Sequence, residues 1–198
     1  MEVVEIIGAV IGLIYLLLEY KANAWLWPVG ILMSLFYVVI FFNGKFYADA
    51  AVNLYYIGAN IYGLALWRRH RHRDKTEIVA ELPITHVPST TIIYIAAISL
   101  LLWGALFVLL EYLTDSPVPL GDSFTTALSI VAMWLLAKKF LEQWLFWIVV
   151  DVVSAVLYVW KGLYPTAILY AVYTLVAVLG YFQWKKNMLT DVSKENGE

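Results

Sequence analysis

The chain has 198 residues, of which 63% are hydrophobic and only 14% are charged. Soluble domains are about half apolar and about a quarter charged, so this composition excludes an ordinary soluble domain. It predicts an all-α polytopic membrane protein. The chain contains no cysteine, which excludes disulfides and cysteine metal sites. The net charge of −2 says little, because the charges are segregated by loop.

Apolar runs long enough to cross a bilayer recur seven times. The predicted transmembrane spans are 3–20, 25–42, 47–67, 91–112, 123–138, 142–160 and 164–184. Turn residues separate them, as in "NGK" at 43–45 and "DSPVPLGD" at 115–122. The first run lacks a basic n-region and a cleavage site, so we interpret it as a retained span. The polar tail at 187–198 is predicted to be disordered.

The basic residues are distributed unequally between the two sides that seven spans define. One side holds 11 of the 13, namely Lys21, Arg68, Arg69, Arg71, Arg73, Lys75, Lys138, Lys139, Lys185, Lys186 and Lys194, and the other holds Lys45 and Lys161. The positive-inside rule then predicts an outer N-terminus and a cytoplasmic C-terminus in a bacterial inner membrane. The cluster "RRHRHRDK" at 68–75 is interpreted as this topology signal, with contacts to lipid headgroups in addition.

The first and last thirds of the chain resemble each other. With an offset of 117, Gly63 matches Gly180 and Trp67 matches Trp184, and Gly44 and Gly162 mark a turn in each copy. Upstream, an offset of 120 matches Trp27 with Trp147 and places Leu32 or Ile31 opposite Asp151, so the loops are expected to differ in length. Two three-span copies joined by one span predict a 3+1+3 parallel repeat with a midplane site between the halves.

This repeat divides the chain into five predicted segments. They are a first triple-helix bundle at 1–67, a basic cytoplasmic loop at 68–90, a linker helix at 91–112, a second bundle at 113–186 and the tail at 187–198.

Polar and aromatic residues follow helical spacing along several spans and predict a substrate-binding face. The candidates are Trp27, Asn53, Tyr56, Asn60, Trp144, Trp147, Asp151, Ser154, Tyr170 and Tyr173. Simpler explanations stand beside this one. Gly63 and Gly180 suit close helix contacts, and Trp67 and Trp184 suit an interfacial belt beside basic residues. Asn60 suits an interhelical hydrogen bond, Tyr170 and Tyr173 suit core packing, and Asp49 suits a helix N-cap.

Asp151 is the most informative candidate, because it lies near the middle of its span. A carboxylate there costs about 2.5–3.5 kcal/mol on insertion scales. No basic residue lies at comparable depth in any predicted span. Asp151 is therefore protonated, hydrogen-bonded to a neighbour, or available to a cationic ligand. Trp144 and Trp147 share its face, and aromatic rings with a carboxylate suit a flat cation.

Several segments resemble the PnuC-type vitamin transporters over roughly 1–186. They are "AKKFLEQWLFW" with its W-x-x-W, "LYVWKGLYPTAILYAVYTLVAVLGYFQWKK", and "FFNGKFYADAAVNLYYIGANIYGLALW" with its Y-A-D and N-x-Y-G. The resemblance implies a 3+1+3, SWEET-like fold, a homotrimer, and a site lined by Trp144 and Trp147. It also implies facilitated diffusion of an unphosphorylated vitamin, drawn inward by a cytoplasmic vitamin kinase.

The resemblance implies thiamine or nicotinamide riboside as the substrate. In this family the nicotinamide-riboside branch has an amide at the position of Asp151 and polar groups at the positions of Leu169 and Leu179. The resemblance therefore favours the thiamine-type (PnuT) branch for this sequence. Nicotinamide riboside is the alternative, since both vitamins carry a fixed positive charge on an aromatic ring.

Two other classes of function fit less well. An intramembrane enzyme needs a nucleophile with a base, a carboxylate pair or a metal set, whereas His70, His72 and His86 all lie in one loop. A membrane scaffold does not need a midplane carboxylate. No phosphate-binding loop motif is present, so the chain is not expected to use ATP itself. No cofactor, metal or nucleic-acid partner is expected, and proton coupling through Asp151 stays open.

Overall fold

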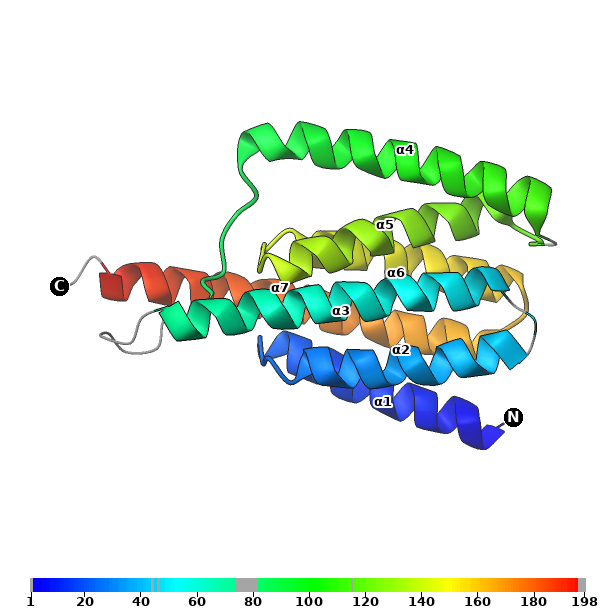
Figure 1. Cartoon of the computed structure of the whole chain (residues 1–198), viewed down its shortest axis with the longest axis horizontal. Coiled ribbons are helices and arrows are strands. Elements are labelled where there is room, and N and C mark those ends of the chain that lie inside the picture. The colour runs from blue at the N-terminus through cyan, green and yellow to red at the C-terminus, as the bar shows by residue number, and fades with distance from the viewer. Residues whose placement is uncertain (1, 44, 46, 74–81, 115, 196–198) are drawn as a thin grey trace. The chain divides into compact units, whose positions relative to one another are not determined.

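The computed structural model describes residues 2–43, 45, 47–73, 82–114 and 116–195, which form seven α-helices (Figure 1). They are α1 (Glu2–Tyr20), α2 (Leu26–Asn43), α3 (Tyr47–Arg73), α4 (Ser89–Leu113), α5 (Pro119–Ala137), α6 (Gln143–Trp160) and α7 (Tyr164–Glu195). Five of them, α2, α4, α5, α6 and α7, are long and apolar enough to cross a membrane. In α1 the apolar stretch is Val10–Tyr20, and α3 ends in a basic run. An all-helical polytopic fold is therefore confirmed.

Two predicted loop or tail segments are helical. The helix α3 continues to Arg73, so the basic loop predicted from residue 68 begins later. The disorder predicted for the tail is wrong over 187–195, because α7 continues to Glu195. That stretch has no glycine or proline, and Gln183 donates a hydrogen bond of 3.1 Å to Asn187 within the helix. Residues 74–81 and 196–198, and the side chain of Asp49, lie outside what the structure describes.

The chain forms two compact units, and each is considered by itself. The first unit is Met1–Pro83 with Ala137–Lys139, and the second is Ile84–Leu136 with Phe140–Glu198. In the first unit α2 packs against α3 and α1, and in the second α6 packs against α7. Val87, which precedes α4, and Ile95 of α4 form an apolar cluster with Val131 and Leu135 of α5.

The helices α1 to α3 and the helices α5 to α7 share one register. The starts of α2 and α6 are 117 residues apart, as are the starts of α3 and α7 and the ends of α1 and α5. Five residues separate α1 from α2 and also α5 from α6, and three separate α2 from α3 and also α6 from α7. The predicted offset of 120 for the second helix, with loops of different length, is therefore wrong.

The same register holds for the backbone of the turns. Ala22 and Lys139 have φ values of 50° and 54°, while Lys45 and Gly162 have 62° and 74°. Each pair is again 117 residues apart, so Lys45 and not Gly44 corresponds to Gly162. Left-handed residues of this kind end helices. After α1, the Asn23 amide donates to the Leu18 carbonyl at 2.9 Å, and after α5 the equivalent bond from Phe140 to Leu135 is 3.0 Å. Residues can therefore be compared at a constant offset of 117.

Candidate substrate site

Each unit contains a perpendicular pair of tryptophans. The ring centroids of Trp27 and Trp67 are 5.3 Å apart at 89°, and those of Trp144 and Trp184 are 5.7 Å apart at 88°. All four are buried. The interfacial-belt interpretation of Trp67 and Trp184 is therefore wrong, since both side chains lie inside the protein and pack against another tryptophan.

A glycine lies under one tryptophan of each pair. A Cβ added to Gly63 would collide with the Trp27 ring, and one added to Gly180 would lie 2.6 Å from the Trp144 ring. The prediction that these glycines permit close helix contact is confirmed. Trp27 and Trp144 therefore occupy equivalent positions, and the burial of Trp144 follows from packing that both units share. Its assignment to the substrate site stays a prediction.

The residues that distinguish α6 from α2 lie in one row. Gln143, Trp147 and Asp151 are spaced by four residues and therefore share one face of α6. We call these three residues the α6 row. Their counterparts at the constant offset are Leu26, Gly30 and Ser34. Gln143 is 0% exposed and Asp151 is 6% exposed, and Ser154 on the same side of the helix is also buried.

The polar groups of the α6 row have no partner within the part of the chain that the structure describes. This holds for both side-chain polar atoms of Gln143 and for the indole nitrogen of Trp147. It holds also for the carboxylate of Asp151, for which the described residues provide neither a hydrogen bond nor an ion pair. Buried polar groups are nearly always hydrogen-bonded, so an unpaired group needs an explanation. Of the three states expected for Asp151, a hydrogen bond to a neighbouring side chain is not seen among these residues.

Gln143 was not among the predicted site residues. It stands at the first position of α6, inside the predicted span 142–160, but the predicted substrate-binding face does not include it. Its spacing of four from Trp147 and eight from Asp151 could have indicated it.

The first unit differs from the second around Gly30, the residue equivalent to Trp147. Gly30 lies against Asn60, because an added Cβ would collide with the Asn60 amide, and it would lie 2.9 Å from the Tyr15 ring. At the equivalent positions the second unit has Trp147 and the buried Ala177. Large and small residues are thus exchanged between the two helices. The Asn60 amide donates to the Tyr56 carbonyl at 2.7 Å, a bond within α3 and not between helices as expected.

The predicted tyrosines of α7 lie in an aromatic row. The centroids of Tyr158 and Tyr170 are 5.1 Å apart, and those of Tyr170 and Tyr173 are 5.6 Å apart. Lys161, which lies 5.6 Å from the Tyr158 ring, forms an ion pair of 2.9 Å with Asp122. This packing agrees with the simpler explanation for Tyr170 and Tyr173, whose contact with substrate stays a prediction. Of the other candidates, Trp27, Asn53, Tyr56 and Asn60 belong to the first unit.

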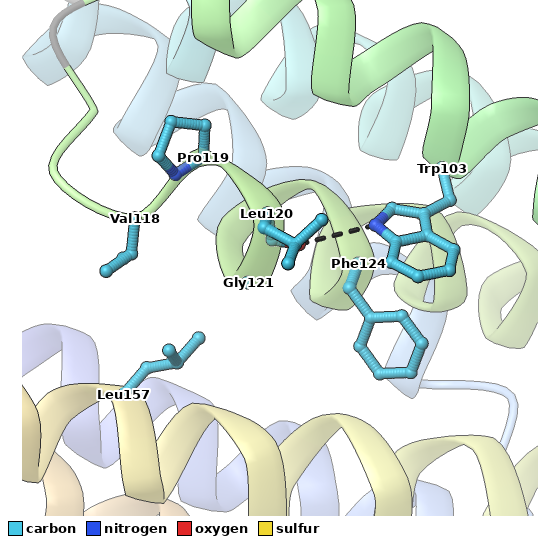
Figure 2. A pocket seen from close by; sticks show the side chains of 7 residues that line it. All are labelled: Trp103, Val118, Pro119, Leu120, Gly121, Phe124 and Leu157. Atoms are coloured by element: carbon cyan, nitrogen blue, oxygen red, sulfur yellow. Dashed lines mark hydrogen bonds between the residues drawn. The ribbon is translucent and has the colours of Figure 1, made fainter.

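An apolar cavity of about 430 Å³ opens elsewhere in the second unit (Figure 2). Its lining is Trp103, Val118, Pro119, Leu120, Gly121, Phe124 and Leu157. The Trp103 indole donates to the Leu120 carbonyl at 3.3 Å, and Leu157 of α6 points towards Val118. No charged side chain lines this cavity, so nothing there offsets the charge of a cation. The α6 row is therefore the better candidate site.

The fold and the α6 row together define a class of protein. Polar and ionisable side chains within membrane helices mark substrate and ion pathways. These features are those of a multi-pass membrane transporter.

Comparison with known proteins identifies the family. The family described as "Nicotinamide mononucleotide transporter" matches residues 2–186. The chain therefore belongs to this family, the PnuC-type transporters, and its relatives are transporters and not enzymes.

This chain covers most of the length of several relatives. The nicotinamide riboside transporter PnuC of Escherichia coli is 26% identical, over 91% of this chain and 84% of that protein. The riboflavin/roseoflavin transporter RibM of Streptomyces davaonensis is 27% identical, over 91% of this chain and 83% of that protein. A crystal structure of the vitamin B3 transporter PnuC has a TM-score of 0.72 and 25% identity, covering 92% of this chain and 80% of that one.

Proposed function

We propose that this protein imports an unphosphorylated, cationic aromatic vitamin across the bacterial inner membrane by facilitated diffusion. One observation carries the proposal: Asp151, 6% exposed in the middle of an apolar helix, has no partner among the described residues. A buried carboxylate without a partner is costly, and a cationic ligand would offset its charge. Trp147, one turn away, offers a ring for cation–π stacking with the same ligand.

Nicotinamide riboside is the substrate that the comparisons favour. The relatives in Escherichia coli, Neisseria mucosa and Haemophilus influenzae are named as its transporters. Its pyridinium ring combines the aromatic surface and the positive charge that Trp147 and Asp151 suit.

Thiamine is the second candidate. Its thiazolium ring is also cationic, and the resemblance associates an acidic residue at position 151 with the thiamine-type branch. The argument from Leu179 loses weight, since that side chain is 59% exposed and does not lie with the buried residues of α7. Riboflavin, which the name of RibM suggests, carries no positive charge and leaves Asp151 without a counter-ion.

The transport cycle in this proposal needs no energy source within the chain. The N-terminus lies outside, and the side with 11 basic residues faces the cytoplasm. A midplane site opens alternately to the two faces. Phosphorylation of the vitamin by a cytoplasmic kinase keeps the internal concentration of free substrate low, which maintains net inward flux. A homotrimer is part of the proposal, and native mass measurement in detergent tests it.

The experiment is exchange of labelled vitamin by purified protein in liposomes, without ATP or an ion gradient. We expect saturable uptake of nicotinamide riboside or thiamine that stops when internal and external concentrations are equal. Empty liposomes and liposomes with Asp151→Ala are the controls. Uptake that requires a proton or sodium gradient would overturn facilitated diffusion, and the two vitamins tested in parallel decide between the substrates.

A further inference from the structure

Gln143 is a fully buried amide at the first position of α6. Its backbone amide donates to the Phe140 carbonyl at 3.3 Å, but its side-chain oxygen and nitrogen have no partner among the residues described. Glutamine is mostly a surface residue, and leaving both of its polar atoms buried and unpaired is unfavourable. The first unit has Leu26 at the same backbone position, also 0% exposed. The fold therefore accepts an apolar side chain here, and packing does not require an amide.

The α6 row places this amide at a defined distance from the carboxylate. Four residues separate Gln143 from Trp147 and four separate Trp147 from Asp151, so the row spans about 12 Å along one helix face. A flat heterocycle stacked on Trp147 would have its positive charge towards Asp151. Its other edge would then face the end of the row that Gln143 occupies.

We infer that Gln143 is a specificity-determining residue that binds the polar edge of the vitamin's heterocycle, where a hydrogen-bond donor stands beside an acceptor. The inference rests on the proposed function. A glutamine amide presents a carbonyl oxygen and an NH₂ group side by side. It therefore forms two parallel hydrogen bonds with such an edge, as glutamine does with adenine. These bonds would satisfy both unpaired atoms at once.

This edge is chemistry that three candidate vitamins share. Nicotinamide riboside has it in its carboxamide, thiamine in its aminopyrimidine, and riboflavin in the imide of its flavin ring. Gln143 therefore selects for the edge, while Asp151 selects for the positive charge. A ligand that lacks the edge leaves the Gln143 amide buried without partners, and a site built to form hydrogen bonds rejects such ligands strongly.

The test is calorimetric titration of the full-length protein in detergent with the vitamin that binds the wild type. Each vitamin has an analogue without the edge: pyridinium riboside, thiamine without its 4-amino group, or N3-methylriboflavin. Gln143→Leu copies the residue found at Leu26. We expect it to weaken binding of the parent vitamin roughly 10- to 100-fold and to leave binding of the analogue within about twofold. Gln183→Leu, which removes a partly buried amide that bonds Asn187, is the matched control and should leave both affinities unchanged.

The outcomes separate the two claims. If neither nicotinamide riboside nor thiamine binds the wild type, the proposed function fails, and if riboflavin does not bind either, the inference fails with it. If a vitamin binds and Gln143→Leu binds it equally well, or loses parent and analogue alike, only the inference fails. Should Gln143→Leu prove too unstable to purify, the wild type decides alone. An analogue that then binds as tightly as its parent overturns the role of Gln143, and one that binds at least tenfold more weakly supports it.

Discussion

Gly180→Ala tests whether Trp144 is held in place by packing. The added Cβ would lie 2.6 Å from the Trp144 ring, whereas ordinary contacts begin at 3.4 Å, so ring and helix must separate by about 0.8 Å. Overpacking of this kind costs about 1–3 kcal/mol. Replacing a helical glycine by alanine gains up to about 1 kcal/mol in propensity. The comparison with a control glycine isolates the packing cost, because the propensity gain is common to both variants.

Gly58→Ala is that control, since nothing lies within 4 Å of the added Cβ. We expect the free energy of unfolding of Gly180→Ala, measured by SDS titration in mixed micelles, to lie about 1–3 kcal/mol below that of Gly58→Ala. Trp144→Phe replaces the indole by a smaller ring, which leaves room for the added Cβ. In the Trp144→Phe background, Gly180→Ala should therefore cost less stability than in the wild type, by more than about 0.5 kcal/mol. Equal stability of Gly180→Ala and Gly58→Ala would show that Trp144 is not packed on α7 as described.

Three further predictions concern the site and its surroundings. Trp147→Ala should weaken vitamin binding in calorimetry by roughly tenfold or more, because stacking is lost. Trp27→Ala should lower stability and leave affinity within a few-fold. The reverse pattern would place the site in the first unit. Asp151→Asn should weaken binding of a cationic vitamin roughly 10- to 100-fold but not that of uncharged riboflavin, and equal effects on both would mean that Asp151 does not act through its charge. Asp122→Asn breaks the partly buried pair with Lys161 and should cost about 0–1 kcal/mol of stability with unchanged liposome uptake; a tenfold loss of uptake would contradict a purely structural pair.

Much of the fold could be predicted because hydrophobic length and turn residues are local properties. The helix α6 begins one residue from its predicted start and ends where predicted. The register of the repeat was harder. The second half has Trp144 and Trp147, and the first has Trp25 and Trp27, so matching tryptophans by identity is ambiguous. The left-handed residues in the turns settle the register, and the sequence does not display φ angles.

The candidate site was predictable in part. Asp151 stands out by its depth in an apolar span, which the sequence shows directly. That it lacks a partner depends on which side chains other helices bring near, and no spacing within α6 reveals this. Trp184 lies beside basic residues, a pattern typical of interfacial tryptophans, and only its contact with Trp144 shows that it is internal. Gln143 was missed because a glutamine at a helix start usually faces water.

The exchange of large and small residues between Gly30–Asn60 and Trp147–Ala177 has a consequence for protein engineering. Since α2 and α6 share one backbone register, the α6 row can be copied into α2 by Leu26→Gln, Gly30→Trp and Ser34→Asp. The tryptophan would meet the Asn60 and Tyr15 side chains, so relocation of the site also needs smaller residues at both positions. A transplant of binding specificity in this scaffold therefore involves α1, α2 and α3, and one that changes α2 alone should fail for lack of space.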